Sequence, residues 1–310
     1  MQFYPHTEET FLMHTATPLS RLAWLLASLL TAAPAFAQST LDKIKSSGSI
    51  TLAYRESSIP FSYLDEKAQP VGFGVDICDR IVDEIKKTTG RADLKVERQS
   101  VTSANRIPLL VNGTIDLECG STTNNSDRGK QVAFAINYFY TGTRFLVKTD
   151  SGIKGLADMN NKVLVSTTGT TNFRIVRNII TEQKLPIELI GAKDHSESAL
   201  LVQTGRASAF AMDDILLYGL RASAQNPAEM AVVGEPIQVE PYAIMMRRDD
   251  PGIKTVVDGV LAGLMKSGEF TRLYAKWFLS PIPPKGINLN APMDKALLDN
   301  LKALSDKPAT

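Results

Sequence analysis

Short apolar runs alternate with helical spacing along most of this chain. The run SITLAYR (49–55) is typical of a buried strand. The next segment predicts a helix, because five of its residues share one helical face: Val75, Cys78, Ile81, Val82 and Ile85. The succession continues with a strand at 93–101, a helix at 106–113 that ends at Gly113, and a strand at 114–120.

The alternation starts again past residue 143. Strands are predicted at RFLVK, KVLVST, IELIGA, AFAMDD and MAVVGE, with helices near 171–184, 196–204 and 214–224. A strand at YAIMMRR and a helix over 253–279 follow. Strands that alternate with helices indicate an α/β fold with parallel sheets, and the restart indicates two similar lobes.

The predicted strand ends are rich in serine, threonine and arginine. Ligands of open parallel sheets bind beyond the carboxyl ends of the strands, where loops and helix starts offer free N–H groups. Any one of these hydroxyls is more simply a helix cap or a turn residue. Their recurrence at successive strand ends favours a polar binding site.

Composition narrows the class of protein. The 310 residues are 44% hydrophobic, enough for two modest domains with cores of their own. The 34 basic and 33 acidic residues nearly cancel, and no basic stripe occurs, so nucleic-acid binding is not indicated. There is also no phosphate-binding loop, dinucleotide fingerprint or nucleophile elbow, so the sequence does not predict an enzyme.

Residues 1–37 have the features of a secretory signal peptide. Arg21 precedes an apolar run, and Ala-Phe-Ala at 35–37 is a small-x-small cleavage site. Met13 is a candidate for the true start, because residues 1–12 are unusual ahead of such a signal. An exported chain can join its two cysteines, Cys78 and Cys119, in one disulfide or keep them as buried thiols. Two thiols and three scattered histidines do not make a metal site, and no cofactor is expected.

Several long strings resemble the periplasmic substrate-binding proteins of ABC importers for polar amino acids, in particular the glutamate/aspartate-binding branch. They include TSANRIPLLVNGTIDLECGSTTNN, AKDHSES, GRASAFAMDDILL and WFLSPIPPKGINLN. The resemblance covers about 40–308. It implies a type II periplasmic binding protein fold with two crossing hinge strands, a periplasmic monomer, and a permease in the inner membrane as partner.

The resemblance also implies domain boundaries. Lobe 1 combines 40–141 with 246–310, and lobe 2 is 148–238. The hinge strands are about 142–147 and 239–245.

The resemblance assigns ligand-binding roles residue by residue. For the α-carboxylate of an amino acid it implies Arg128, Ser121, Thr123, Thr170 and Thr171. Asp213 meets the α-ammonium group. A side-chain carboxylate is met by four further residues: Arg55, Ser103, Arg106 and His195.

Physical chemistry supports an acidic ligand at such a site. Buried carboxylates are tolerable only when they are paired, and the planar guanidinium fork suits them. Three arginines against one aspartate predict a surplus of positive charge. If His195 contacts a carboxylate, its charged form is favoured and affinity becomes pH-sensitive near neutrality.

Other interpretations stay open. Each arginine could make an ordinary surface ion pair. The same fold hosts periplasmic enzymes of the cyclohexadienyl dehydratase type, for which Glu118 is the nearest acid unless it is buried behind Cys119. A binder of another polar amino acid such as glutamine, and a sensor ectodomain, are the remaining alternatives.

Overall fold

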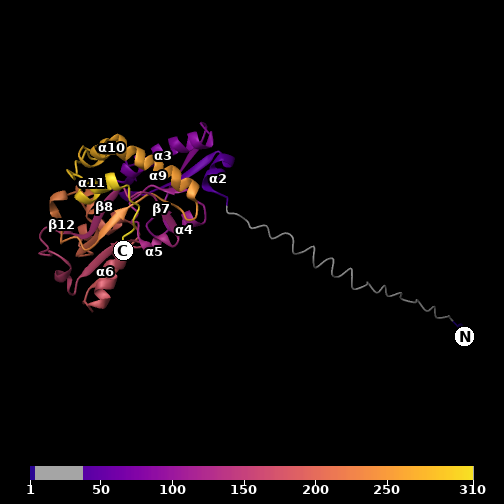
Figure 1. Cartoon of the computed structure of the whole chain (residues 1–310). Coiled ribbons are helices and arrows are strands. Elements are labelled where there is room, and N and C mark those ends of the chain that lie inside the picture. The colour runs from indigo at the N-terminus through magenta and orange to yellow at the C-terminus, as the bar shows by residue number, and fades with distance from the viewer. Residues whose placement is uncertain (4–37, 310) are drawn as a thin grey trace. The chain divides into compact units, whose positions relative to one another are not determined.

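The structure is a computed structural model that describes residues 1–3 and 38–309 (Figure 1). Apart from residues 1–3, the predicted signal peptide and the candidate start Met13 lie outside the described residues. The unit described below begins at Ser39 and contains every helix and strand named here.

The first sheet has five strands, in the order β5 (Lys95–Ser100), β1 (Ser49–Tyr54), β6 (Leu117–Glu118), β14 (Met245–Arg247) and β7 (Val132–Phe134). The first three are parallel, and β14 is antiparallel to both of its neighbours. The predicted strand over 114–120 is reduced to two residues in β6. Strand β1 comes first in the chain, and in this sheet it lies between β5 and β6.

The second sheet repeats this order, with β10 (Glu188–Ala192), β9 (Val163–Thr167), β11 (Ala209–Asp213), β8 (Phe139–Lys148) and β12 (Met230–Val233). Again the first three strands are parallel, while β8 runs antiparallel to β11 and β12. The repetition confirms the α/β prediction and the restart that the apolar pattern indicated.

Two paired strands join the halves of the chain. Strand β8 leads from the first sheet into the second, and β13 (Val239–Tyr242) leads back, with Val239 opposite Gly142 and Tyr242 opposite Phe139. The predicted single strand over 242–248 is therefore divided between β13 and β14. A small third sheet of β2 (Ser57–Ser58), β3 (Ser62–Leu64) and β4 (Pro70–Val71) was not predicted.

Helices cover the sheets. Near the first sheet lie α2 (Thr40–Ser47), α3 (Phe73–Thr89), α4 (Arg106–Val111), α5 (Ser126–Gly129), α9 (Pro251–Ser267), α10 (Glu269–Phe278) and α11 (Lys295–Ala303). The second sheet carries η1 (Leu156–Met159), α6 (Thr171–Glu182), α7 (His195–Gln203), α8 (Asp214–Ser223) and η2 (Pro227–Glu229). Figure 1 shows α3, α9 and α10 gathered on the side of the unit away from α6.

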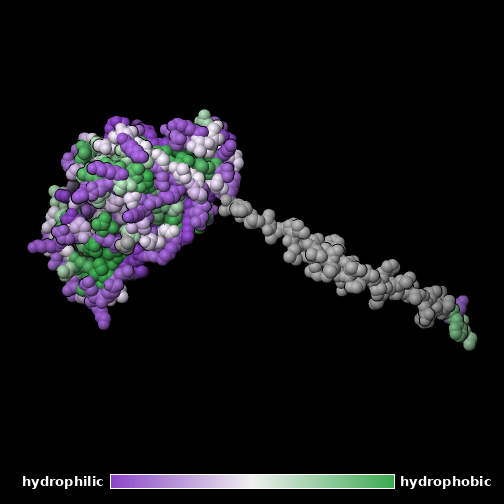
Figure 2. Space-filling model, viewed as in Figure 1, coloured by the Kyte–Doolittle hydropathy of each residue, from purple (hydrophilic) through white to green (hydrophobic). Residues whose placement is uncertain are grey.

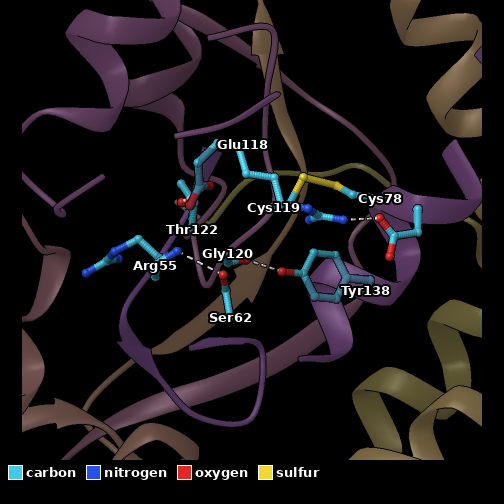
Figure 3. The surroundings of a disulfide bond; sticks show 10 residues. Arg55, Ser62, Cys78, Glu118, Cys119, Gly120, Thr122 and Tyr138 are labelled. Atoms are coloured by element: carbon cyan, nitrogen blue, oxygen red, sulfur yellow. Dashed lines mark hydrogen bonds and ion pairs between the residues drawn. A yellow bond between two sulfur atoms is a disulfide. The ribbon is translucent and has the colours of Figure 1, made fainter. Parts of the chain in front are cut away.

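The predicted helix over 253–279 is two helices, because Gly268 takes a left-handed φ of 78° and separates α9 from α10. The predicted apolar face of α3 is buried as expected, and four of its five residues pack in the largest hydrophobic cluster: Cys78, Ile81, Val82 and Ile85. A disulfide joins Cys78 on this face to Cys119, the residue that follows β6 (Figure 3). The bond therefore anchors α3 to the strand end that enters the candidate site.

The outer face of the unit is mixed. In Figure 2, hydrophobic residues form separate patches among hydrophilic ones. Among the residues described, none of the helices combines the length and apolar character that crossing a bilayer requires.

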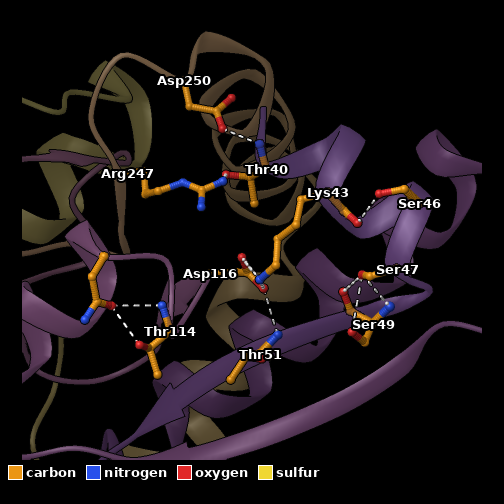
Figure 4. A network of polar contacts seen from close by, with 11 residues as sticks. Thr40, Lys43, Ser46, Ser47, Ser49, Thr51, Thr114, Asp116, Arg247 and Asp250 are labelled. Carbon is orange, nitrogen blue, oxygen red and sulfur yellow. Dashed lines mark hydrogen bonds and ion pairs between the residues drawn. The ribbon is translucent and has the colours of Figure 1, made fainter. Parts of the chain in front are cut away.

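A buried carboxylate fastens α2 to the first sheet (Figure 4). Lys43 donates from Nζ to both oxygens of Asp116, at 2.7 and 2.9 Å, and the backbone N–H of Thr51 donates to the same carboxylate at 2.9 Å. The Asp116 side chain is fully buried, whereas that of Lys43 is 31% exposed. Lys43 thus supplies the charge that offsets a carboxylate with no access to water.

Replacing Lys43 by methionine should lower the free energy of unfolding by about 2 kcal/mol, because the buried Asp116 loses the side chain that donates to both of its oxygens. The value is below that of a fully buried pair, since water screens the exposed part of Lys43. Urea unfolding followed by circular dichroism measures it. The control is Lys45→Met on the exposed side of the same helix, which should change stability by less than about 0.5 kcal/mol. Equal effects of the two variants would contradict the assignment.

Candidate functional site

All ten residues predicted for ligand binding are buried, none more than 8% exposed. They follow the carboxyl ends of the parallel strands in both sheets. In the first sheet, Arg55 follows β1, Ser103 and Arg106 follow β5, and the segment that holds Ser121, Thr123 and Arg128 follows β6. In the second, Thr170 and Thr171 follow β9, His195 follows β10, and Asp213 ends β11.

The structure brings the two sets together. Arg55 Nη2 lies 3.4 Å from His195 Nε2, and Arg128 Nη2 donates to the carbonyl oxygen of Gly169 at 3.3 Å. The hydroxyl oxygens of Thr123 and Thr171 are 3.3 Å apart. Each of these contacts joins a residue of the first sheet's loops to one of the second's.

Gly169 permits this approach. A Cβ atom at this position would lie 2.6 Å from Ala104 Cα and 2.7 Å from Ala104 N, so any side chain would force the two loops apart. Its φ of +83° also lies in the region that favours glycine. The turn at 169–171 therefore packs directly on the loop that holds Ser103.

Arg128 is fixed by two hydrogen bonds within its own loop. Its backbone N–H donates to the Asn125 side chain at 2.9 Å, and Nη1 donates to the carbonyl oxygen of Thr123 at 2.9 Å. Burial and, to a lesser extent, the charge of Arg106 lower the pKa of Arg128 to about 9. The guanidinium is still protonated at neutral pH.

Asn124 and Asn125 also contact the last residues of the described chain, and Asn125 forms a β-bridge with Ala309. Asn124 Nδ2 donates to the carbonyl oxygen of Asp306 at 2.7 Å and to Asn137 Oδ1 at 3.0 Å. The backbone N–H of Ala309 donates to the carbonyl oxygen of Asn124 at 2.9 Å. Residues 305–309 therefore lie along the loop that positions Thr123 and Arg128.

The other two guanidiniums are only partly paired. Arg55 Nε donates to the carbonyl oxygen of Val101 at 3.1 Å, and Arg106 Nη1 to that of Ser121 at 3.5 Å. Burial, followed by the charge of Arg106, lowers the pKa of Arg55 to about 10. Within the described part of the chain, four buried atoms of the ten predicted residues have no hydrogen-bond partner: Arg55 Nη1, Arg106 Nε, Ser103 Oγ and Ser121 Oγ.

A chain of hydroxyls fixes the proton of His195. Ser198 Oγ donates to the carbonyl oxygen of Asp194 at 2.9 Å, so Ser198 must accept from Thr167, whose Oγ1 is 2.9 Å away. Thr167 must then accept from His195 Nδ1 at 2.8 Å. The proton sits on Nδ1, and Nε2 accepts from Arg55.

His195 is accordingly neutral in this arrangement. Burial, together with the charges of Arg55 and Arg106, holds its pKa well below the usual 6.5. The sequence-based expectation of a charged histidine depended on contact with a carboxylate. Here His195 contacts a guanidinium instead, and the shift has the opposite direction.

Asp213 is held from two sides. Asn172 Nδ2 donates to Oδ1 at 2.7 Å, and the hydroxyl of Tyr242 donates to Oδ2. Burial and the nearby charge of Glu240 raise the pKa of Asp213 well above its ordinary value. Asp213 does not cap α8 with its side chain, so its carboxylate is available to the site.

Thr170 has a local structural role. Its hydroxyl donates to the carbonyl oxygen of Thr167 at 2.7 Å and accepts from the backbone N–H of Phe173 at 3.1 Å, which caps α6. Its hydroxyl is therefore engaged within the turn, whereas the hydroxyl of Thr171 points toward Thr123. A ligand contact by Thr170 stays a prediction.

The charge count made from the sequence is wrong. Besides Asp213, two further carboxylates are buried near the three arginines, Glu118 and Glu240, at 0% and 1% exposure. Both raise the pKa of Arg128 in opposition to burial. Three guanidiniums thus face three carboxylates rather than one, so a surplus of positive charge cannot by itself explain a preference for anions.

Glu118 lies beside the disulfide, close to Arg55 and Thr122 (Figure 3). Its Oε2 accepts from the hydroxyl of Thr122, and Oε1 has no partner among the described residues. The sequence left open whether this acid faces the opening, and the structure buries it completely. A charged residue inside the apolar run TIDLECG was the available signal.

Glu240 is a third buried carboxylate at the site that the sequence does not predict. It lies on β13, and its Oε2 accepts from the hydroxyls of Thr123 at 2.8 Å and Thr171 at 2.6 Å. Glu240 precedes Pro241 in a segment that is predicted only to join the lobes. Nothing in that segment indicates a role at the site. Across the described part of the chain, no group of His, Cys, Asp and Glu side chains is arranged to hold a metal ion.

Comparison with known proteins identifies the family of this chain. Residues 50–280 match the profile of the bacterial extracellular solute-binding proteins, family 3. The chain is 44% identical over 294 residues to the L-glutamate/L-aspartate-binding protein of Pseudomonas aeruginosa, covering 94% of this chain and 97% of that one. It is 46% identical over 277 residues to the glutamate/aspartate import solute-binding protein of Escherichia coli, covering 89% and 90%.

Solved structures agree on the fold. A crystal structure of a mutant of ArgBP from T. maritima superposes with a TM-score of 0.69 at 27% identity, covering 76% of this chain and 98% of that one. The type II periplasmic binding protein fold predicted from the sequence is thereby confirmed. The chain belongs to the bacterial extracellular solute-binding proteins, family 3.

Proposed function

We propose that this protein captures L-glutamate or L-aspartate in the periplasm and delivers it to the permease subunits of an ABC transporter in the inner membrane. Two curated relatives, 44% and 46% identical, are named for binding or importing these amino acids. Both names describe a binding protein, and one of them describes import, which supports binding without turnover.

The observation that carries the proposal is the convergence of buried hydrogen-bond donors without acceptors. Arg55 Nη1, Arg106 Nε and Ser103 Oγ are such donors, and they belong to the group expected to meet a side-chain carboxylate. A ligand with a second carboxylate supplies acceptors to these donors. A glutamine side chain offers one oxygen and adds two N–H donors, so it leaves donors unpaired.

The proposed division of roles follows from which residues lie together. Arg128, Ser121 and the turn at 169–171 bind the α-carboxylate, and Asp213 accepts from the α-ammonium. Arg55, Ser103 and Arg106 bind the side-chain carboxylate, and His195 acts on this group through Arg55, from which its Nε2 accepts. The contact of Arg55 with His195, and that of Arg128 with Gly169, support two groups that span both sheets.

Capture occurs by closure of two lobes about a hinge. We take lobe 1 as 40–141 with 246–310, lobe 2 as 148–238, and the hinge as 142–147 and 239–245. The pairing of β8 with β13 supports this division, because these strands are the two crossings between the sheets. A ligand that contacts both lobes binds the closed arrangement more tightly and shifts the population toward it.

The protein must be exported to the periplasm before it can bind its ligand there. The family is extracellular, and the proposed signal peptide at 1–37 would be cleaved after Ala37 to release a monomeric periplasmic protein. No cofactor takes part in the proposed capture.

Calorimetric titration of the protein that begins at Gln38 tests the function. L-Glutamate or L-aspartate should bind with micromolar affinity or better, because about 8 kcal/mol is within reach of several charge-assisted hydrogen bonds. L-Glutamine should bind at least about 10-fold more weakly, since each unpaired buried donor costs about 1–3 kcal/mol. L-Arginine and prephenate are the controls. No heat with either acidic amino acid refutes the proposal, and turnover of prephenate indicates an enzyme.

Two arginine variants should separate the two carboxylates. Arg128→Ala should weaken all amino-acid binding by at least about 100-fold, because loss of one partner of a buried charge contact costs about 2–5 kcal/mol. Arg106→Ala should mainly reduce the preference for glutamate over glutamine. Arg272→Ala, at an exposed position on α10, is the matched control and should bind as the unaltered protein does. Unchanged selectivity in Arg106→Ala would contradict the division of roles.

His195 should stay neutral in the ligand-free protein. It is the only histidine of the chain from Gln38 onward, so imidazole ¹⁵N NMR reports on it alone. The spectrum should show the neutral form with the proton on Nδ1 from pH 8 to pH 6, because its folded pKa lies well below 6.5. The urea-unfolded chain, as control, should titrate near 6.5.

The same shift affects stability. Below pH 6.5 the unfolded chain binds a proton that the folded protein does not, so His195 lowers the free energy of unfolding as the pH falls below 6.5. A folded-state midpoint near 6.5 in the NMR titration would show that the hydroxyl chain does not control this ring.

A further inference from the structure

Residues 305–309, which we call the strap, lie along the loop that follows β6 and pair with it. The backbone N–H of Ala309 donates to the carbonyl oxygen of Asn124 at 2.9 Å, and Ala309 forms a parallel β-bridge with Asn125. The strap comes after α11 in the chain, more than 180 residues beyond this loop, as the separation of Asn124 from Asp306 shows. It therefore acts as an added edge for a segment that is distant in sequence.

The other edge of the same loop pairs with β13, the returning crossing strand. The backbone N–H of Asn124 donates to the carbonyl oxygen of Pro241 at 2.8 Å, and Thr123 forms an antiparallel bridge with Tyr242. Asn124 thus directs its N–H to β13 and its carbonyl oxygen to the strap. Without the strap, this short segment would have one unpaired edge.

Three buried asparagine side chains hold the strap: Asn124, Asn137 and Asn300, none more than 3% exposed. Nδ2 of the first donates to the carbonyl oxygen of Asp306 at 2.7 Å, and Nδ2 of the second to that of Lys307 at 2.9 Å. Oδ1 of the third accepts from the backbone N–H of Ser305 at 2.9 Å. All three bind backbone atoms, so the strap is recognised by the course of its chain more than by its own side chains.

The loop that the strap covers is the one that fixes Arg128. Asn125 Oδ1 accepts from the backbone N–H of Arg128 at 2.9 Å, and Arg128 Nη1 donates to the carbonyl oxygen of Thr123 at 2.9 Å. Thr123 and Asn125 are the two neighbours of Asn124 in the chain. A shift of Asn124 therefore moves both groups that orient the guanidinium.

We infer that residues 305–309 are a positioning strap for the ligand site: by pairing with Asn124 and Asn125, they hold the loop against β13 and keep Arg128 in the place where it binds the ligand. The strap acts through the loop and not by touching the ligand. The inference rests on the proposed function, in which Arg128 binds the α-carboxylate that all amino acids share.

A purely structural role makes a different prediction. If the strap only stabilised the fold, its loss would lower the unfolding temperature and leave the dissociation constant of the folded protein unchanged. If it positions Arg128, its loss raises the dissociation constants of L-glutamate and L-glutamine by the same factor. Their ratio stays constant, because Arg55, Ser103 and Arg106 are not part of this loop.

The experiment removes one hydrogen bond of the strap and leaves the rest of the chain in place. Ala309→Pro lacks the backbone N–H that donates to Asn124, whereas the control Ala309→Ser keeps it. A third variant ends at Leu304 and lacks the whole strap. All are compared with the unaltered chain from Gln38 onward by calorimetric titration with L-glutamate and L-glutamine, well below their unfolding temperatures.

We expect Ala309→Pro to bind L-glutamate at least about 3-fold more weakly, the effect of one hydrogen bond, and the variant that ends at Leu304 at least about 10-fold more weakly. Ala309→Ser should bind as the unaltered protein does. Equal affinities of Ala309→Pro and Ala309→Ser overturn the inference. A changed ratio of L-glutamate to L-glutamine affinity in Ala309→Pro also overturns it. If the variant that ends at Leu304 does not fold, the pair at residue 309 decides.

Amide hydrogen exchange tests the strap without any ligand. Segment 121–130 should exchange faster in Ala309→Pro than in Ala309→Ser, while α6 in the other half of the unit exchanges equally in both. Equal exchange of segment 121–130 in the two variants overturns the inference. If the unaltered protein binds neither acidic amino acid, the proposed function fails, and the exchange measurement still shows whether the strap holds the loop.

Discussion

Three guanidinium groups stand buried where the loops of two sheets meet, and the site is organised around their need for acceptors. An arginine remains protonated even where burial lowers its pKa, as at Arg55 and Arg128, so the surrounding chain must supply oxygen atoms. Backbone carbonyls supply several, from Val101, Ser121, Thr123 and Gly169. These residues belong to loops that are distant in sequence, and the strand order brings their ends to one place.

Three carboxyl groups are also buried at this site. Glu118, Asp213 and Glu240 are buried near the three guanidiniums, and each of them raises the pKa of Arg128 against the effect of burial. A zwitterionic group then meets both guanidiniums and carboxyl groups in the same buried place. Selectivity in such a site depends on where donors and acceptors are placed, more than on the net field.

Much of this molecule could be predicted from the amino-acid sequence. Apolar spacing located α3 and most strands of both sheets, because buried faces impose their period on the chain. The ten candidate site residues were predicted because they follow strand ends, and because long strings resemble a known family. The break at Gly268 was missed, since one glycine in an otherwise helical pattern is compatible with a continuous helix.

Features that depend on distant contacts were not predictable. Nothing local to Glu240 indicates that hydroxyls from two loops donate to it, and nothing near Asn124 indicates that it binds residues 305–309. The proton position of His195 follows from a chain of three further residues, two of which are not adjacent to it in sequence. Contacts of this kind exist only once the fold has formed.

The contact at Gly169 has a consequence for how closely the two sets of loops can approach. With no side chain, this glycine leaves only hydrogen atoms between its Cα and Ala104, so the backbones themselves are the mechanical stop. A stop made of backbone is stiff, because it has no rotamers that could yield. Closure against it would end at a defined separation of the two backbones. The depth of the enclosed space would then be set by the course of the backbone. A ligand one methylene longer than this depth allows would fit poorly.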